Sequence, residues 1–290
     1  LTTHYVIMLF RGQARLDRRD DARTTYDSAK ALAADDPVAM LGLADAVYTS
    51  ATYLLSDMAA TLKRIKDQHP DDFDYTDAYC AMLVQLGNMN GAIREIKAYL
   101  DRKPATARAI RQLLMCNSAG SKPYLKRFFE HATNDDIAEL DSESLASTLN
   151  MRGAHVAVDA LISSFDSPEV PFEPYYSIWM ESLFALGKYG EIVRLGEYSE
   201  ILDSLLQTPL KGASMAFVYT VSLLKTGNYD KASEYVARVR PIIEQTMADV
   251  PLPLRMAQRT FLTLASKIDK DHVDDKLYWQ YFDMLGYGKL

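Results

Sequence analysis

Adjacent acidic residues are the feature of this chain that could most readily do chemistry. Two carboxylates at one site can act as acid and base in a hydrolase, or they can bind a divalent cation. Most of these pairs stand where helices are predicted to begin, and carboxylates there accept hydrogen bonds from free N–H groups and favour the helix dipole. We therefore interpret them as helix caps. The pairs are Asp20-Asp21, Asp35-Asp36, Asp71-Asp72, Asp135-Asp136 and Asp274-Asp275.

Other catalytic and metal-binding patterns are missing from the sequence. The five histidines are scattered singly, and none forms a His-Glu-x-x-His motif or stands beside a cysteine. Neither a Gly-x-Ser-x-Gly nor a Gly-x4-Gly-Lys-Ser/Thr motif occurs. We predict a chain that is not an enzyme, with no catalytic residue, no metal site and no cofactor. The histidines are His4, His69, His131, His155 and His272.

Charge and composition narrow the choice of partner. The net charge is −7, and no basic run is longer than the two residues of Arg18-Arg19, so nothing predicts a nucleic-acid contact. No apolar run approaches the roughly 18 to 20 residues of a membrane span, and no secretory signal is evident, so we expect a cytoplasmic protein. The two cysteines, Cys80 and Cys116, lack partners at metal-ligand or redox spacing and are expected in the core.

Helices must position any functional residues, because apolar residues recur at spacings of three and four throughout the chain. A seven-residue turn, "LGNMNGA", "LGKYGEI" or "TGNYDKA", follows three of the apolar runs. Each turn contains a glycine, Gly87, Gly187 or Gly227, which is expected just past a helix C-terminus in the left-handed conformation. The pattern predicts antiparallel helix pairs.

Prolines provide a second measure of the repeat. Pro37, Pro70 and Pro104 are 33 and 34 residues apart, each near the start of a predicted helix pair. A helix-turn-helix unit of about 34 residues resembles the tetratricopeptide repeat. The matching positions around the three turn glycines are an aromatic residue (Tyr79, Trp179, Tyr219), a leucine (Leu83, Leu183, Leu223) and a residue in the second helix that is small in two of three cases (Ala92, Ile192, Ala232).

The resemblance implies an all-α fold, a right-handed α-solenoid of about seven helix pairs in which each pair covers its neighbour. We expect one domain over residues 1–290, with a kink or sub-domain boundary near 167–174, where three prolines stand close together. Two regions match less well: "LDRRD" lacks a turn glycine, and residues 105–170 show helices without a repeat signature.

The same resemblance implies a groove lined by one face of each first helix, where a partner docks. Members that hold a chaperone's C-terminal carboxylate use basic residues and asparagine there, whereas this chain has Asp74 and Asp77. That difference favours a basic or amphipathic helical peptide. The expected groove residues are Asp74, Asp77, Ala81, Val84, Ser177, Glu181, Phe184, Ser214, Phe217, Val221 and Leu224.

Apolar residues near both ends of the chain predict a second kind of interface. The segment "HYVIMLF" is apolar on every helical face, and a helix of this kind is normally buried. Either residues that precede Leu1 or another chain would cover it, and we expect a partner or a second copy. The residues expected at such end interfaces are Tyr5, Val6, Ile7, Leu9, Phe10, Trp279 and Phe282.

Three functions are compatible with these patterns. The first is a non-catalytic scaffold or partner chaperone that binds a peptide or helix in the groove. The second is a structural subunit that packs through its ends into a homo-oligomer or an obligate complex. The third is a ligand-sensing or substrate-binding module of an enzyme or regulator.

Overall fold

The computed structural model describes residues 2–116, 120–165, 173–197, 199–206, 211–246 and 252–266. These residues form helices and no strand, which confirms the all-α prediction. The chain divides into two compact units, unit 1 (Leu1–Cys116) and unit 2 (Asn117–Leu290). The sequence predicted one domain with a boundary, if any, near 167–174. Residues 167–172 lie outside the described residues, so that boundary stays a prediction.

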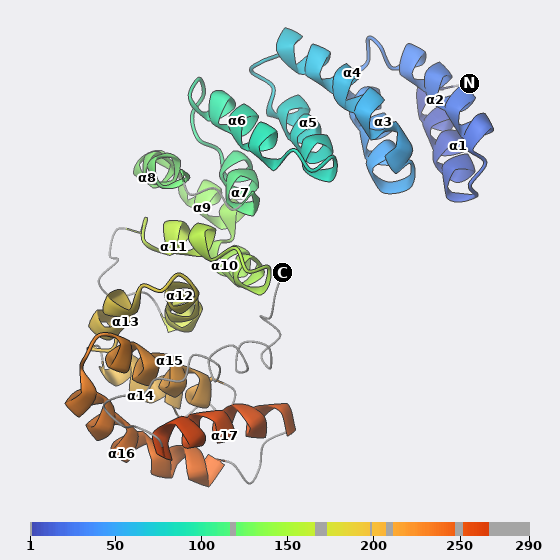
Figure 1. Ribbon diagram of the computed structural model, residues 1–290. Helices are drawn as coiled ribbons and strands as arrows, with labels where there is room; N and C mark the ends of the chain where they lie inside the picture. Colours follow the sequence, from blue (N-terminus) through green and yellow to red (C-terminus); the bar gives the residue numbers. More distant parts are fainter. Residues whose placement is uncertain are drawn as a thin grey trace. The chain divides into compact units, whose positions relative to one another are not determined.

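Unit 1 is a series of helices that pack on one another in chain order (Figure 1). The alternate helices α1, α3, α5 and α7 also contact one another in succession, so that one face of the unit is built from first helices alone. This is the arrangement that repeated helix pairs produce. The elements are α1 (Thr3–Arg15), α2 (Arg19–Leu32), α3 (Pro37–Ser50), η1 (Thr52–Leu54), α4 (Leu55–Gln68), α5 (Phe73–Gln85), α6 (Met89–Leu100) and α7 (Ala107–Met115).

In the second part of unit 2 the helix α15 is central, because it contacts α12, α13, α14, α16 and α17, whereas α10 and α11 pack on α12. Every residue of α15 from Gly212 to Leu224 is buried, so this helix has no face open to solvent. The described elements are α8 (Lys122–His131), α9 (Asn134–Leu140), α10 (Ser142–Met151), α11 (His155–Ile162), α12 (Glu173–Ala185), α13 (Tyr189–Leu195), α14 (Ser199–Leu206), α15 (Gly212–Lys225), α16 (Tyr229–Thr246) and α17 (Leu252–Ser266).

The three predicted turn glycines all adopt the left-handed conformation. At Gly87, where φ is 77°, the backbone N–H donates to the carbonyl of Val84 at 3.0 Å. The next N–H donates to the carbonyl of Leu83 at 2.8 Å, which completes a Schellman motif. The turns at Gly187 and Gly227, where φ is 70° and 76°, contain the equivalent two hydrogen bonds. The predicted helix-turn-helix pairs are therefore confirmed at these places.

Two more turns of the same kind occur where the sequence showed no clear signature. Gly153, between α10 and α11, has a φ of 70° and lies 34 residues before Gly187. Asp17, between α1 and α2, has a φ of 55°, and its N–H donates to the carbonyl of Ala14 at 3.1 Å. Aspartate is one of the few L-residues that occupies this region without a large penalty, because its short side chain bonds locally. The missing glycine in "LDRRD" therefore does not prevent the turn.

The contact between the two helices of a pair is closely packed. The residue five positions after each turn is completely buried, at 0% exposure, in all five pairs. The aromatic residues Tyr79, Trp179 and Tyr219 are also buried, at 8%, 2% and 8% exposure, so they belong to the core. The five residues at the helix contact are Ala22, Ala92, Val158, Ile192 and Ala232.

Both cysteines lie in unit 1 and are free and buried, as predicted. The thiol of Cys80 contacts the carbonyl oxygen of Ala92 at 3.6 Å, between α5 and α6. Burial raises the pKa of both the Cys80 and the Cys116 thiol above its ordinary value. Both thiols therefore stay protonated in the folded unit at neutral pH.

Several acidic pairs cap helices, as predicted. Asp36 accepts a hydrogen bond from the backbone N–H of Ala39 at 3.0 Å, at the start of α3. Asp72 accepts one from an N–H in the first turn of α5 at 2.9 Å. Thr133 and Asp136 form a reciprocal capping box on α9. Of the other pairs, Asp20-Asp21 lie in the first turn of α2 without such a bond, and Asp274-Asp275 lie outside the described residues.

Candidate functional site

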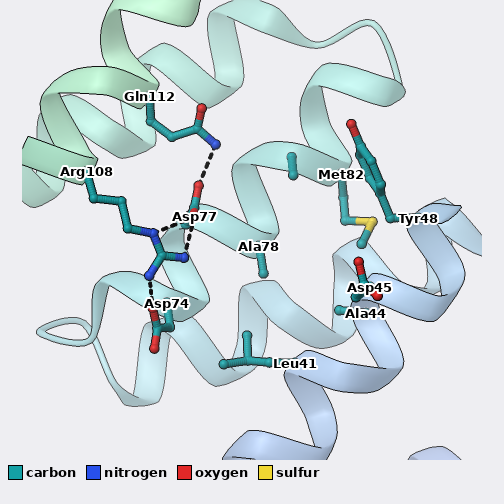
Figure 2. A pocket seen from close by; sticks show the side chains of 11 residues that line it. Leu41, Ala44, Asp45, Tyr48, Asp74, Asp77, Ala78, Met82, Arg108 and Gln112 are labelled. Carbon is teal, nitrogen blue, oxygen red and sulfur yellow. Dashed lines mark hydrogen bonds and ion pairs between the residues drawn. The ribbon is translucent and has the colours of Figure 1, made fainter. Parts of the chain in front are cut away.

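A cavity of about 480 Å³ lies along the first helices of unit 1, between α3, α5 and α7. Figure 2 shows a polar cluster from α5 and α7 on one side, residues of α3 with Met82 on the other, and Leu41 and Ala78 between them. The apolar lining residues are Leu41, Ala44, Ala78, Ala81 and Met82, and the polar ones are Asp45, Tyr48, Asp74, Asp77, Arg108 and Gln112.

The polar cluster is centred on Arg108 of α7, which bridges two carboxylates of α5 (Figure 2). Its Nε donates to Asp77 Oδ2 at 3.0 Å, and its Nη1 donates to Asp74 Oδ1. The guanidinium carbon lies 5.6 Å from the ring centroid of Phe73. Gln112 Nε2 donates to Asp77 Oδ1, so both oxygens of this carboxylate accept hydrogen bonds.

The carboxylates of Asp77 and Asp74 stabilise the charged form of Arg108. Partial burial acts to lower the pKa of Arg108, but hydrogen bonds and charge attraction from Asp77 and Asp74 outweigh it and raise this pKa above its ordinary value. The side chains of Arg108 and Asp74 are nevertheless 50% and 48% exposed. Ion pairs this exposed stabilise a fold by only about 0.2–1 kcal/mol. The cluster is thus an ordered but weakly held contact.

A second cavity, of about 620 Å³, adjoins the first along α1 and α3. Asp45 lines both cavities and forms an ion pair with Arg11 of α1. The two cavities together, called here the unit 1 groove, therefore extend over the successive first helices α1, α3, α5 and α7. The second cavity is lined by Thr2, Thr3, His4, Ile7, Met8, Arg11, Asp36, Val38, Ala39, Gly42 and Asp45.

In unit 1 the structure places three of the four predicted groove residues together. Asp74, Asp77 and Ala81 line the first cavity, whereas Val84, 36% exposed, does not. The two carboxylates differ from the expectation in one respect, because they are already paired with Arg108.

In unit 2 the structure corrects the groove prediction. Six of the seven predicted residues are between 1% and 4% exposed, because the helices that carry them are covered by neighbouring helices. The seventh, Glu181, accepts a hydrogen bond from Asn150 Nδ2 at 2.8 Å and so belongs to a contact between α10 and α12. The six buried residues are Ser177, Phe184, Ser214, Phe217, Val221 and Leu224.

The predicted end interface is also partly corrected. Val6 and Phe10 are 7% and 0% exposed, and Phe10 contacts Tyr26 of α2 at a ring-centroid distance of 5.7 Å, so both are core residues. Ile7 is 6% exposed, and it lines the second cavity. Tyr5 and Leu9 are 56% and 45% exposed, together with the neighbouring residue Met8 at 50%. Trp279 and Phe282 lie outside the described residues.

Several lining residues were missed by the sequence analysis, chiefly Arg108, Asp45 and Arg11. Asp74 and Arg108 are 34 residues apart, and so are Arg11 and Asp45. Opposite charges 34 residues apart on successive first helices could therefore have predicted these ion pairs. Nothing in the sequence pointed to Leu41, Tyr48 or Gln112.

Unit 2 contains a charge cluster around one buried carboxylate, that of Asp159. Asp159, 5% exposed, accepts from Trp179 Nε1 at 3.1 Å and from Lys188 Nζ at 2.8 Å, and Lys122 lies 3.6 Å away. Burial alone would raise the pKa of Asp159, but these partners outweigh burial and hold this pKa below its ordinary value. The cluster joins α8, α11, α12 and the start of α13, and its carboxylate oxygens are already occupied.

Within the described ranges, no three histidine, cysteine, aspartate or glutamate side chains are grouped so that they could hold a metal ion. No helix in the same part of the chain is long and apolar enough to cross a membrane. No protein-family model matches the chain, and no curated protein matches its sequence.

Proposed function

We propose that this chain is a tetratricopeptide-like, right-handed α-solenoid of about seven helix pairs that acts without chemistry of its own. It binds a peptide or a helix of a partner protein in the unit 1 groove, as a scaffold or partner chaperone. The observation that carries this proposal is the pair of adjoining cavities along α1, α3, α5 and α7. The first cavity, of about 480 Å³, has room for side chains of a partner.

The lining of the groove favours a partner segment with both apolar and basic side chains. Ala44, Ala78 and Ala81 have short side chains and leave room for a partner's apolar residue between the helices. Around them the two cavities carry four aspartates, including Asp36 and Asp45, but only two arginines. An excess of carboxylates attracts a basic segment and disfavours an acidic one. A basic amphipathic helix meets both requirements.

A substitution that fills the cavity tests this proposal. In Ala81→Trp the indole occupies the space where the partner's side chain would lie, whereas Ala60→Trp places the same ring on the exposed surface of α4. The tagged full chain and both variants are purified from native cells and their companions are identified by mass spectrometry. We expect a stoichiometric partner with the unsubstituted chain and with Ala60→Trp, but not with Ala81→Trp. Equal recovery with all three would contradict groove binding.

A second function is favoured by the outer face of α1. Tyr5 and Leu9 are 56% and 45% exposed, and with Met8, which also lines the second cavity, they form an apolar patch on one helix. Such a patch is covered when a chain packs end to end in a homo-oligomer or an obligate complex.

Sedimentation over a range of concentrations separates this function from the first. If α1 is an interface between copies, Leu9→Glu lowers the mass at high concentration. Leu32→Glu, at a leucine of α2 that is 51% exposed against 45% for Leu9, leaves the mass unchanged. A constant monomer mass for all three proteins would count against packing between copies.

A further inference from the structure

We propose that Asp74, Asp77 and Gln112 form a guanidinium-binding subsite, that Arg108 occupies it in the free chain, and that an arginine of the bound peptide takes its place. This inference rests on the proposed function of the unit 1 groove and specifies the chemistry of its partner. Arg108 is then an internal competitor that sets the affinity of the groove for arginine-containing segments.

The geometry of the subsite fits a guanidinium better than an ammonium group. Two carboxylates receive separate N–H groups of one planar side chain, with Nε directed to Asp77 and Nη1 to Asp74. Gln112 donates to the second oxygen of Asp77 and so fixes the orientation of that carboxylate. The ring of Phe73, 5.6 Å from the guanidinium carbon, adds a cation–π contact. A planar fork with several donors satisfies all these groups, whereas the compact ammonium of lysine does not.

The occupant of the subsite can be exchanged at little cost. Arg108 is 50% exposed, and it stands on α7, the last helix of unit 1 along the chain. Asp77, in contrast, is only 18% exposed and keeps its bond from Gln112 when the arginine leaves. Asp77 is therefore held in place without the arginine, and Arg108 can swing into solvent, where its hydration compensates for the lost ion pairs.

The subsite also lies where a ligand would reach it. Arg108, Asp74 and Asp77 line the same cavity as the apolar residues Leu41 and Met82 (Figure 2). A peptide that placed an apolar side chain between α3 and α5 would bring its neighbouring side chains to the Asp74–Asp77 end. An arginine at that point finds two carboxylates that are already positioned for a guanidinium.

Chemical rescue tests the subsite without any knowledge of the partner. The full chain carrying Arg108→Ala is heated in a titration of n-propylguanidinium that extends to about 0.1 M, because half-exposed ion pairs predict weak binding, and n-propylamine at the same concentrations serves as the comparison. We expect n-propylguanidinium to raise the melting temperature of the variant and n-propylamine to do so much less. Asp77→Asn added to Arg108→Ala removes the effect. If Arg108→Ala does not fold, Arg108→Gln replaces it, because glutamine keeps part of the stem and removes the charge.

A peptide selection tests the displacement. Random 12-residue peptides displayed on phage are selected on the full chain, and the best binder is synthesised with arginine or with its neutral isostere citrulline. We expect the arginine peptide to bind Arg108→Ala about two- to fivefold more tightly than the unsubstituted chain. The citrulline peptide should bind both proteins alike.

The outcomes separate the two proposals. No rescue, together with equal or weaker binding of the arginine peptide to Arg108→Ala, overturns the subsite and leaves the groove intact as a peptide site. Rescue without any selected peptide overturns the proposed function and the displacement with it. Rescue together with tighter binding that depends on arginine supports both.

Discussion

Asp77 in unit 1 and Phe217 in unit 2 both stand ten residues before a turn glycine, yet their surroundings are opposite. Asp77 lines a cavity and faces Arg108, whereas Phe217 is 1% exposed. The difference comes from the neighbours of each helix. In unit 2, α14 and α17 pack on α15 in addition to α12, α13 and α16. A repeat position thus defines a face of a helix, but only the surrounding helices decide whether that face is open.

The largest effect is expected in unit 2. Phe217→Ala should lower the free energy of unfolding by about 3–5 kcal/mol, because it removes a completely packed ring from the core. Chemical denaturation measures the loss. Asp77→Ala, the matched position in unit 1, should cost about 1 kcal/mol or less, since its ion pair is partly exposed. Equal losses would mean that the two faces do not differ in burial.

The next largest effect is expected at Asp159, the buried carboxylate of the charge cluster in unit 2. Asp159→Asn should lower the free energy of unfolding by about 1.5–3 kcal/mol at pH 7, because hydrogen bonds to a charged group are lost. The pKa of Asp159 is depressed in the folded chain, so its contribution is complete above its ordinary value of 3.8 and is lost as the pH falls through the folded pKa. Denaturation curves of the two proteins should therefore converge in acid. A difference that persists unchanged at pH 2 would contradict this assignment.

The turns provide a smaller effect that depends on backbone alone. Gly87→Ala should lower the free energy of unfolding by about 1–2 kcal/mol, because alanine is disfavoured at a φ of 77° although its methyl group would meet nothing within 4 Å. Gly12→Ala, inside α1 with equal space, should instead stabilise the chain by about 0.5–1 kcal/mol. The melting temperatures of the two variants should therefore shift in opposite directions. Shifts in the same direction would contradict this account of the turn.

The smallest effect is expected at Arg108. Arg108→Ala should change the free energy of unfolding by less than about 1 kcal/mol, because the ion pairs it removes are half exposed and screened by salt. The remaining difference should shrink when unfolding is repeated at 1 M sodium chloride. A loss of several kcal/mol would show that Arg108 is a structural brace like Asp159 rather than a replaceable occupant of the groove.

Local features were the ones that the sequence predicted well. The turn at Gly87 and the cap at Asp36 depend on residues within a few positions of one another, and both are confirmed. The turn at Asp17 was missed because the expectation required a glycine, although aspartate also reaches the left-handed region. Turns and caps of this kind determine where the helices of each unit begin and end.

The candidate site was predicted only in part, because it depends on contacts between helices far apart in sequence. Asp74 and Asp77 were identified from their helical face, but their partner Arg108 comes from the next pair, 31 to 34 residues later. The burial of Val221 and Leu224 follows from helices that pack on α15 from several directions. No pattern within α15 itself distinguishes a face that is covered from one that is open.

The two cysteines allow the opening of unit 1 to be followed by thiol labelling. The chain has no cysteine other than Cys80 and Cys116, and both are shielded in the unit that contains the groove. A thiol reagent modifies them only during moments when this unit opens, while unit 2 contributes no signal. The labelling rate therefore reports the opening of one half of an unmodified chain, and any ligand that binds only the closed form of unit 1 will slow that rate in proportion to its occupancy.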